Sequence, residues 1–154
     1  MKLANFACIL ALSLALSAYS AWLLAARERP APAPPAEPWA VADIPLLHAD
    51  EAEALWRDSA TLFVDVRSPF DYQVGHIAGA VNLPDEEFEA KLPEVLPQLE
   101  RARAVVVYCK SQDCGKSLWC ALRLRQRGLT QTKIYPGGWN EWFNRGLPAV
   151  RSGG

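Results

Sequence analysis

Three of the four cysteines of this chain lie in one short stretch, YCKSQDCGKSLWC, which runs from Tyr108 to Cys120. The apolar run AVVV precedes the stretch and a helical pattern follows it. A cysteine in this setting can be a nucleophile, half of a disulfide, a metal ligand or a packing residue. Cys109 and Cys114 are five positions apart with no histidine or second cysteine pair nearby, which does not match structural zinc spacing. We therefore predict no metal and no cofactor, and interpret Cys120 as a packing residue.

Cys109 is the cysteine best placed for chemistry, because it ends the run with the clearest strand pattern. Residues 110–115 then form a turn before the next helix. Backbone N–H groups in such a turn, together with the positive end of a helix, can bind an anion. Lys110 and Lys116 add positive charge. These features favour a Cys109 thiolate that attacks an electrophile, with the turn holding the anionic product. The loop by itself is equally consistent with an inert, buried cysteine.

Strand and helix patterns alternate along the part of the chain from residue 43 onward. The patterns predict strands at 44–47, 61–66, 80–84, 104–109 and 133–135, and helices at 49–59, 69–75, 85–100, 116–127 and within 137–146. Two prolines, Pro93 and Pro97, predict a kink or a break in the third helix. The alternation indicates an α/β fold with a parallel sheet covered by helices on both faces. Sites in such sheets form at the carboxyl ends of strands, where Cys109 lies.

The N-terminal part differs sharply in composition from the rest. Residues 4–26 carry no charge and are long enough to cross a hydrocarbon core of about 30 Å as a helix. We therefore predict a membrane anchor at 1–29, a Pro-rich linker at 30–42, a folded domain at 43–151 and a tail at 152–154, with a cleaved signal peptide as the alternative to the anchor. The short segment before the apolar run favours a single-pass protein with an extracytoplasmic domain, periplasmic in a bacterium. The net charge of -1 argues against nucleic acid as a partner.

Three ordered segments resemble the rhodanese family of sulfurtransferases. They are DVRSPFDYQVGHIAGAVNLP, the pair YC followed by a short loop and a helix, and YPGGWNEWFNRGLPAV. The resemblance covers about residues 44–150 and implies a rhodanese-like α/β fold with a parallel sheet of about five strands. It also implies that Cys109 takes a sulfane sulfur from a small donor such as thiosulfate or a persulfide. The resulting Cys109 persulfide would pass its sulfur to cyanide or to another thiol.

The resemblance assigns roles to further residues. It implies that the loop amides and cations stabilise the persulfide, namely those of Lys110, Ser111, Gln112, Asp113, Cys114, Gly115 and Lys116. Asp65 and Arg67 match family positions and are expected to form an ion pair that supports the loops. We interpret His76, Trp139 and Trp142 as structural residues and His48 as solvated.

The cysteine loop also departs from the family pattern. Common rhodanese loops are shorter and often end in an arginine, whereas this loop has Cys114 near that place, followed by Gly115 and Lys116. The related phosphatases need an arginine six positions after the cysteine, where this chain has Gly115, so we exclude phosphoryl transfer. Cys114 is either a resolving thiol, which attacks the persulfide and leaves a Cys109–Cys114 disulfide, or a loop residue that never reaches Cys109.

Three hypotheses for the function follow from these features. The first is a sulfurtransferase with Cys109 as nucleophile. The second is a thiol-disulfide redox protein that uses Cys109 and Cys114 as a pair. The third is a non-catalytic module that has kept the fold. The expected partners are a small sulfur donor, a thiol acceptor or a reductant protein, and the membrane through the N-terminal helix.

Overall fold

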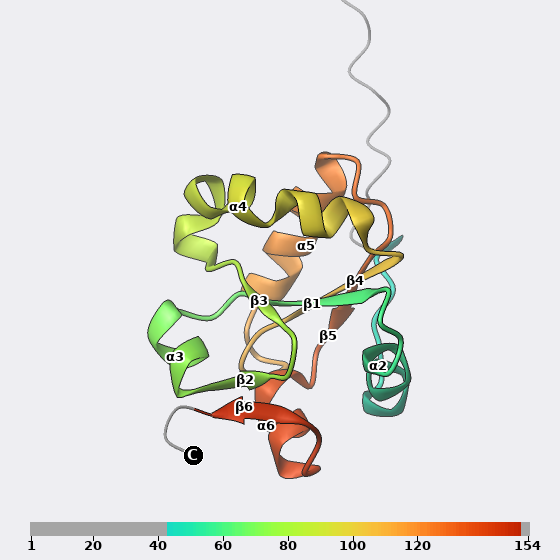
Figure 1. Cartoon of the computed structure of the whole chain (residues 1–154), viewed down its shortest axis with the longest axis vertical. Coiled ribbons are helices and arrows are strands. Elements are labelled where there is room, and N and C mark those ends of the chain that lie inside the picture. The colour runs from blue at the N-terminus through green and yellow to red at the C-terminus, as the bar shows by residue number, and fades with distance from the viewer. Residues whose placement is uncertain (1–42, 152–154) are drawn as a thin grey trace, which may run out of the picture. The chain divides into compact units, whose positions relative to one another are not determined.

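Four parallel strands form the central sheet of the computed structural model, which describes residues 43–151 (Figure 1). The strand order is β3-β1-β4-β5. The strands are β1 (Thr61–Asp65), β3 (Val81–Asn82), β4 (Ala104–Tyr108) and β5 (Thr132–Tyr135). All five residues of β4 are buried, as its uninterrupted apolar sequence predicts for a strand covered on both faces. Cys109 follows β4 directly, so the centre of the sheet sets its position.

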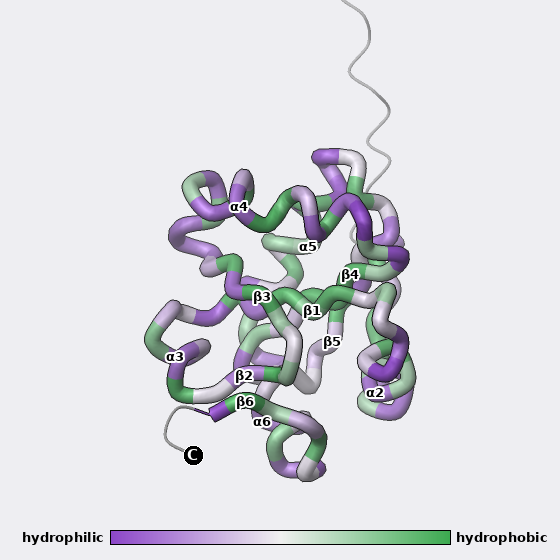
Figure 2. Tube along the Cα trace, in the orientation of Figure 1, coloured by the Kyte–Doolittle hydropathy of each residue, from purple (hydrophilic) through white to green (hydrophobic). Residues whose placement is uncertain are grey.

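Helices cover both faces of this sheet and create two separate cores. On one face, α4 (Phe88–Arg101) and α5 (Lys116–Gln126) pack over the strands; on the other lie α2 (Ala49–Trp56) and α6 (Gly138–Asn144), as Figure 1 shows. The apolar residues concentrate in the central strands and along the inner sides of the helices (Figure 2). The predicted α/β class, with a parallel sheet and helices on both faces, is confirmed.

The expected fifth strand at 44–47 is wrong, because this segment contributes only a single parallel bridge. Leu46 pairs with Ile134, and two backbone hydrogen bonds flank the pair, from Leu47 N to Ile134 O at 2.8 Å and from Ile134 N to Pro45 O at 2.9 Å. Pro45 has no N–H to donate, so the ladder cannot be extended toward the start of the segment. The strand expected at 80–84 is also shorter than predicted and contains only Val81–Asn82.

The helix expected at 85–100 begins as a 3-10 turn, η2 (Asp85–Glu87), and continues as the unbroken helix α4. Pro93 and Pro97 lie inside α4, so of the two predicted outcomes, a kink or a break, the break does not occur. Both prolines are exposed and four positions apart, hence on one face. The opposite face buries Phe88, Leu92, Val95 and Leu99 in the core, and this packing outweighs the hydrogen bonds that the prolines cannot make.

An antiparallel pair of short strands was not predicted. The helix α3 (Pro69–Val74) ends where expected, and β2 (Gly75–Ile77) follows it at once and pairs with β6 (Ala149–Arg151). A Cβ at Gly75 would lie 2.9 Å from the ring of Trp139, so this glycine allows the ribbon to pack against α6. The ribbon ties the last residues of the domain to the segment that follows α3.

The predicted anchor, linker and C-terminal tail lie outside the described residues, so they stay predictions. Within residues 43–151, no helix has both the length and the apolar character that a membrane crossing requires.

Candidate functional site

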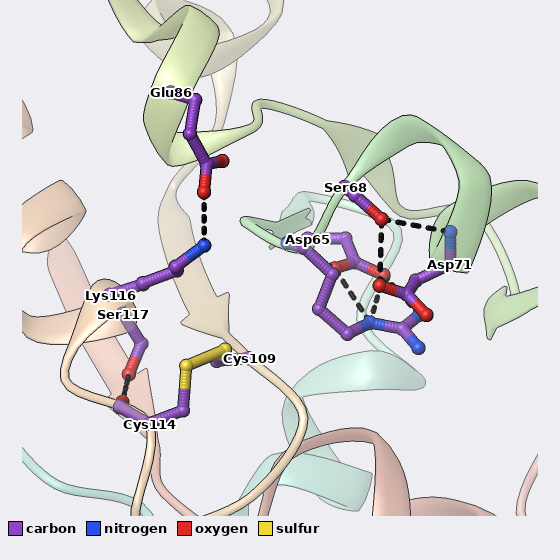
Figure 3. The surroundings of a disulfide bond; sticks show 9 residues. Asp65, Ser68, Asp71, Glu86, Cys109, Cys114, Lys116 and Ser117 are labelled. Atoms are coloured by element: carbon purple, nitrogen blue, oxygen red, sulfur yellow. Dashed lines mark hydrogen bonds and ion pairs between the residues drawn. A yellow bond between two sulfur atoms is a disulfide. The ribbon is translucent and has the colours of Figure 1, made fainter.

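A disulfide joins Cys109 to Cys114 across the loop that follows β4 (Figure 3). The Cα atoms of the two residues are 6.2 Å apart. The sequence left open whether Cys114 reaches Cys109, and the structure places the two sulfur atoms in bonding contact. Cys109 is buried, with 3% of its surface exposed, whereas Cys114 is half-buried. The loop therefore holds a dithiol pair in its oxidised form.

The backbone of this loop leaves most of its N–H groups open. Among the amides from Lys110 to Gly115, that of Cys114 donates to Ser111 O at 3.1 Å. The other five amides have no acceptor among the described residues. Gly115 supplies no side chain to cap α5, so the first amides of that helix also lack a side-chain partner from their N-cap. Backbone N–H groups without an acceptor are the donors that the predicted anion-binding turn would need.

Backbone hydrogen bonds from the first turn of α6 hold the start of the cysteine loop. Trp139 N donates to Cys109 O at 2.9 Å, and Asn140 N donates to Lys110 O at 3.0 Å. Gly138 has a positive φ of 60°, and a Cβ there would lie 2.4 Å from Cys109 O. This contact was not predicted, although the adjacent Gly-Gly pair ahead of a helix could have indicated it.

Lys116 does not direct its ammonium group to the disulfide. Its Nζ forms an ion pair with Glu86 of η2, so the side chain points away from the two sulfur atoms (Figure 3). The hydrogen bond from Lys116 holds the pKa of the Glu86 carboxyl below its usual value. In the oxidised loop the Lys116 ammonium is therefore paired, and its role as an anion-binding cation stays a prediction. Lys110 is exposed and, among the described residues, makes no side-chain ion pair.

A buried polar cluster anchors the end of β4. Arg67 Nη2 lies 2.5 Å from Asp65 Oδ2 and also donates to Gly75 O at 2.6 Å. Tyr108 donates to Asp65 Oδ2 at 2.8 Å, and its oxygen accepts from Ile77 N at 3.1 Å. Burial and then the charge of Asp65 raise the pKa of Tyr108 well above its ordinary value. The cluster ties the residue before Cys109 to β1 and β2, which is the supporting arrangement expected of Asp65 and Arg67.

Burial opposes the charge on Arg67, but the hydrogen bond and the negative charge of Asp65 outweigh it, so the pKa of the guanidinium is raised. The guanidinium carbon also lies 5.0 Å from the ring centre of Trp139. Arg67 is 7% exposed and so has little surface to offer an incoming anion. Its role in this geometry is to hold three segments together.

His76 and Cys120 have structural surroundings. His76 Nδ1 lies 2.8 Å from Tyr72 O, and the two rings are stacked with centres 3.7 Å apart. Cys120 is completely buried in α5, and burial raises the pKa of its thiol, so it stays protonated. Trp142 is fully buried in the core on the α6 side of the sheet. These positions agree with the packing roles that the sequence suggested.

Two cavities, each of about 400 Å³, lie beside the cysteine loop. They share Leu46, Gln112 and Pro136 in their walls. One of them reaches Cys114 and is otherwise lined by Ile44, Leu46, Gln112, Gly115, Ser117, Leu118, Ile134 and Pro136. His48 lines the second cavity together with Glu141. No sequence pattern predicted these cavities, because segments from distant parts of the chain form their walls.

Comparisons with known proteins agree with this geometry. Residues 48–145 match the model of a family described as the rhodanese-like domain. A protein named tRNA uridine(34) hydroxylase from Sodalis glossinidius is 34% identical over 115 residues, which are 70% of this chain and 32% of that protein. The chain therefore spans about a third of the length of this relative.

Two solved structures show the same fold. A rhodanese-related protein from Thermoplasma volcanium is 29% identical, with a TM-score of 0.55 over 69% of this chain and 97% of that one. A thiosulfate sulfurtransferase from Pseudomonas aeruginosa is 23% identical, with a TM-score of 0.58 over 72% of this chain and 21% of that one. The second likeness shows the fold alone.

Proposed function

Because the chain belongs to the rhodanese-like domain family, we propose that it is a sulfurtransferase whose nucleophile is Cys109 in its reduced form. One observation carries the proposal: Cys109 directly follows the central strand β4, at the start of a turn whose amides mostly lack a hydrogen-bond acceptor among the described residues. Amides without an acceptor next to Cys109 are donors that a thiolate or persulfide there could use.

The proposed reaction has two displacement steps at sulfur. The Cys109 thiolate attacks the sulfane sulfur of the donor, the donor's sulfur bond breaks, and the leaving group departs with the electron pair. With thiosulfate as donor, the leaving group is sulfite and Cys109 becomes a persulfide. An acceptor thiolate or cyanide then attacks the outer sulfur of this persulfide, and Cys109 leaves as a thiolate.

The disulfide with Cys114 is the resting form in this scheme. The Cys109 sulfur is bonded and cannot attack a donor until a thiol has reduced the bridge. The redox state of the loop therefore decides whether the transferase cycle can begin.

Thiocyanate formation from thiosulfate and cyanide tests the proposal with the reduced full-length chain. We expect turnover in the wild type, none above background in Cys109→Ser, and near-normal turnover in Cys120→Ala, which removes a cysteine that is buried away from the loop. Equal turnover in Cys109→Ser and wild type would refute the assignment.

A thiol-disulfide redox protein is the second candidate, and the Cys109–Cys114 bridge favours it. Equilibration in glutathione buffers of graded potential, read by the mass of the alkylated chain, measures whether the bridge forms reversibly. A reversible bridge in a protein that transfers no sulfur in either redox state would favour this candidate. A chain inert in both assays, with Cys109 resistant to alkylation, would be a binding module.

The hydroxylase name of the Sodalis relative belongs to a protein about three times as long as the matched region. Three basic residues around the loop and α5 are paired with carboxylates, Lys116 with Glu86, Arg123 with Asp85 and Arg127 with Glu89. This pairing supports a small acceptor or a thiol for the described domain in preference to RNA. Filter binding of tRNA by the full-length chain checks the choice, and salt-sensitive binding would reverse it.

A further inference from the structure

The two sulfur atoms of the disulfide differ in their access to solvent. Cys109 is 3% exposed and packs within the core between the sheet and α5. Cys114 is half-buried and forms part of the wall of a cavity of about 400 Å³, whereas Cys109 does not line that cavity. A solute that enters the cavity therefore meets Cys114 first.

The walls of this cavity restrict the kind of solute that enters. The residues that line it are uncharged, and Ile44, Leu118 and Ile134 are among its apolar members. The nearby ammonium of Lys116 is engaged by Glu86. A doubly charged anion would lose its hydration here without an ionic partner, whereas a small, weakly hydrated sulfur nucleophile would lose much less.

We propose that the oxidised loop takes up hydrosulfide at Cys114 and converts it into the Cys109 persulfide, with the disulfide as the oxidant. This inference rests on the proposed function, because it makes the Cys109 persulfide the product. It adds a second catalytic cysteine and a second sulfur source, one that enters through the cavity beside Cys114.

The first step is attack on the accessible sulfur. An electron pair of hydrosulfide forms a bond to Cys114 Sγ, the Cys109–Cys114 bond breaks, and its electron pair leaves on Cys109. Cys114 is then a perthiol and Cys109 a thiolate. The open amides of the turn between the two cysteines are available to stabilise this thiolate as it forms.

The second step moves the new sulfur inward. The Cys109 thiolate attacks the outer sulfur of the Cys114 perthiol, the bond from Cys114 to that sulfur breaks, and Cys114 leaves as a thiolate. The proton stays on the transferred sulfur. In sum, one disulfide and one hydrosulfide give a Cys109 persulfide and a Cys114 thiolate, so sulfide is oxidised by two electrons and the disulfide is reduced by two.

The experiment uses the oxidised full-length chain and sodium sulfide enriched in a heavy sulfur isotope. We expect the intact mass to rise by one H₂S. After rapid alkylation and proteolysis, the label should lie on Cys114 at the earliest times and on Cys109 later. Label that appears on Cys109 first, or an oxidised chain that acquires no label, would overturn the proposal.

Three variants make the test specific. Cys114→Ser cannot form the bridge, so it should take no sulfur from sulfide. Leu46→Trp narrows the cavity and should slow labelling about tenfold, a barrier change of about 1.4 kcal/mol. Val74→Trp changes an apolar side chain of similar exposure away from the cavity and should leave the labelling rate unchanged.

The two proposals fail in different ways. If the reduced wild type forms no thiocyanate, Cys109 is not a sulfurtransferase nucleophile. Normal thiocyanate formation without labelling of the oxidised chain refutes uptake at Cys114 and leaves the sulfurtransferase intact.

Discussion

Gly138 lies so close to Cys109 that a Cβ at position 138 would come within 2.4 Å of the Cys109 carbonyl oxygen. The same glycine has a φ of 60°, and the amide that follows it, Trp139 N, donates to that oxygen at 2.9 Å. Cys109 is thus held from two sides, by β4 before it and by α6 against it. The position of the thiol depends on a glycine that is distant in sequence.

Replacement of Gly138 by alanine should displace the cysteine loop. The substitution combines backbone strain with a steric clash, so we expect it to lower the free energy of unfolding by about 2–4 kcal/mol and to reduce sulfur transfer. Gly128→Ala is the matched control, because Gly128 has a φ of 88° but no atom within 4 Å of an added Cβ. Urea unfolding of both variants measures the difference, and equal losses would show that the contact with Cys109 constrains nothing.

The ion pair between Lys116 and Glu86 should reduce the affinity of the loop for anionic donors. Glu86→Gln frees the ammonium group, and we expect the KM for thiosulfate to fall about two- to fivefold, the size typical of an exposed charge pair. The kcat should change little, because Lys116 touches no reacting atom in the oxidised loop. Initial rates over a range of thiosulfate concentrations give both constants.

Glu87→Gln is the control for this change, since Glu87 is an adjacent exposed carboxylate without an ion pair among the described residues. If both variants lower KM equally, the effect is one of net charge and not of Lys116. High salt should weaken the difference between Glu86→Gln and wild type.

The parts of the fold that the sequence predicts well are those with strong local patterns. The buried strand β4 and the helix α5 have uninterrupted apolar or helical periodicity, and both form where expected. Pro45 and the two prolines of α4 have opposite outcomes. Each depends on whether tertiary packing compensates for the hydrogen bond that a proline cannot make. The segment at Pro45 had one strand partner and lost its ladder, whereas α4 had a full apolar face against the core and stayed whole.

For the candidate site, the sequence indicated the possible disulfide but not the contacts that position the loop. The spacing of Cys109 and Cys114 allows a bridge, and the structure contains one. The contacts of the loop with Gly138 and with Glu86 connect segments about thirty positions apart. The Gly-Gly pair before α6 is a weak local sign of the first contact, and the second leaves no local pattern in the sequence. The same holds for the cavity at Cys114, whose walls come from residues 44 to 136.

The buried carboxylate Asp65 should be important for stability. Asp65→Asn leaves the guanidinium of Arg67 without its charged partner in a site where Asp65 is fully buried, so we expect a loss of about 3–5 kcal/mol. The exposed carboxylate Asp50, which pairs with Arg145 at the surface, is the control, and Asp50→Asn should cost far less. Chemical denaturation compares the two, and similar small losses would mean that the buried pair contributes no more than a surface pair.

The phenol of Tyr108 should make the stability of the domain depend on pH in the alkaline range. Its pKa in the folded state is raised well above the ordinary value of about 10 that it has in the unfolded chain. Its contribution is therefore complete below pH ~10 and is lost as the pH rises from there toward the folded pKa. We expect the free energy of unfolding to fall in this window by about 1.4 kcal/mol per pH unit for this one group.

Tyr108→Phe isolates this contribution, because Tyr72, Tyr135 and Cys120 also have raised pKa values and titrate in both proteins. At neutral pH the variant should be less stable by about 1–3 kcal/mol, since Ile77 N loses its acceptor and Asp65 loses a donor. As the pH rises above 10, the stability difference between wild type and variant should shrink, because only the wild type has this proton to lose. Urea unfolding at several pH values from 7 to 11 follows the difference, and a constant gap across this range would show that Tyr108 ionises in the folded protein as readily as in the unfolded chain.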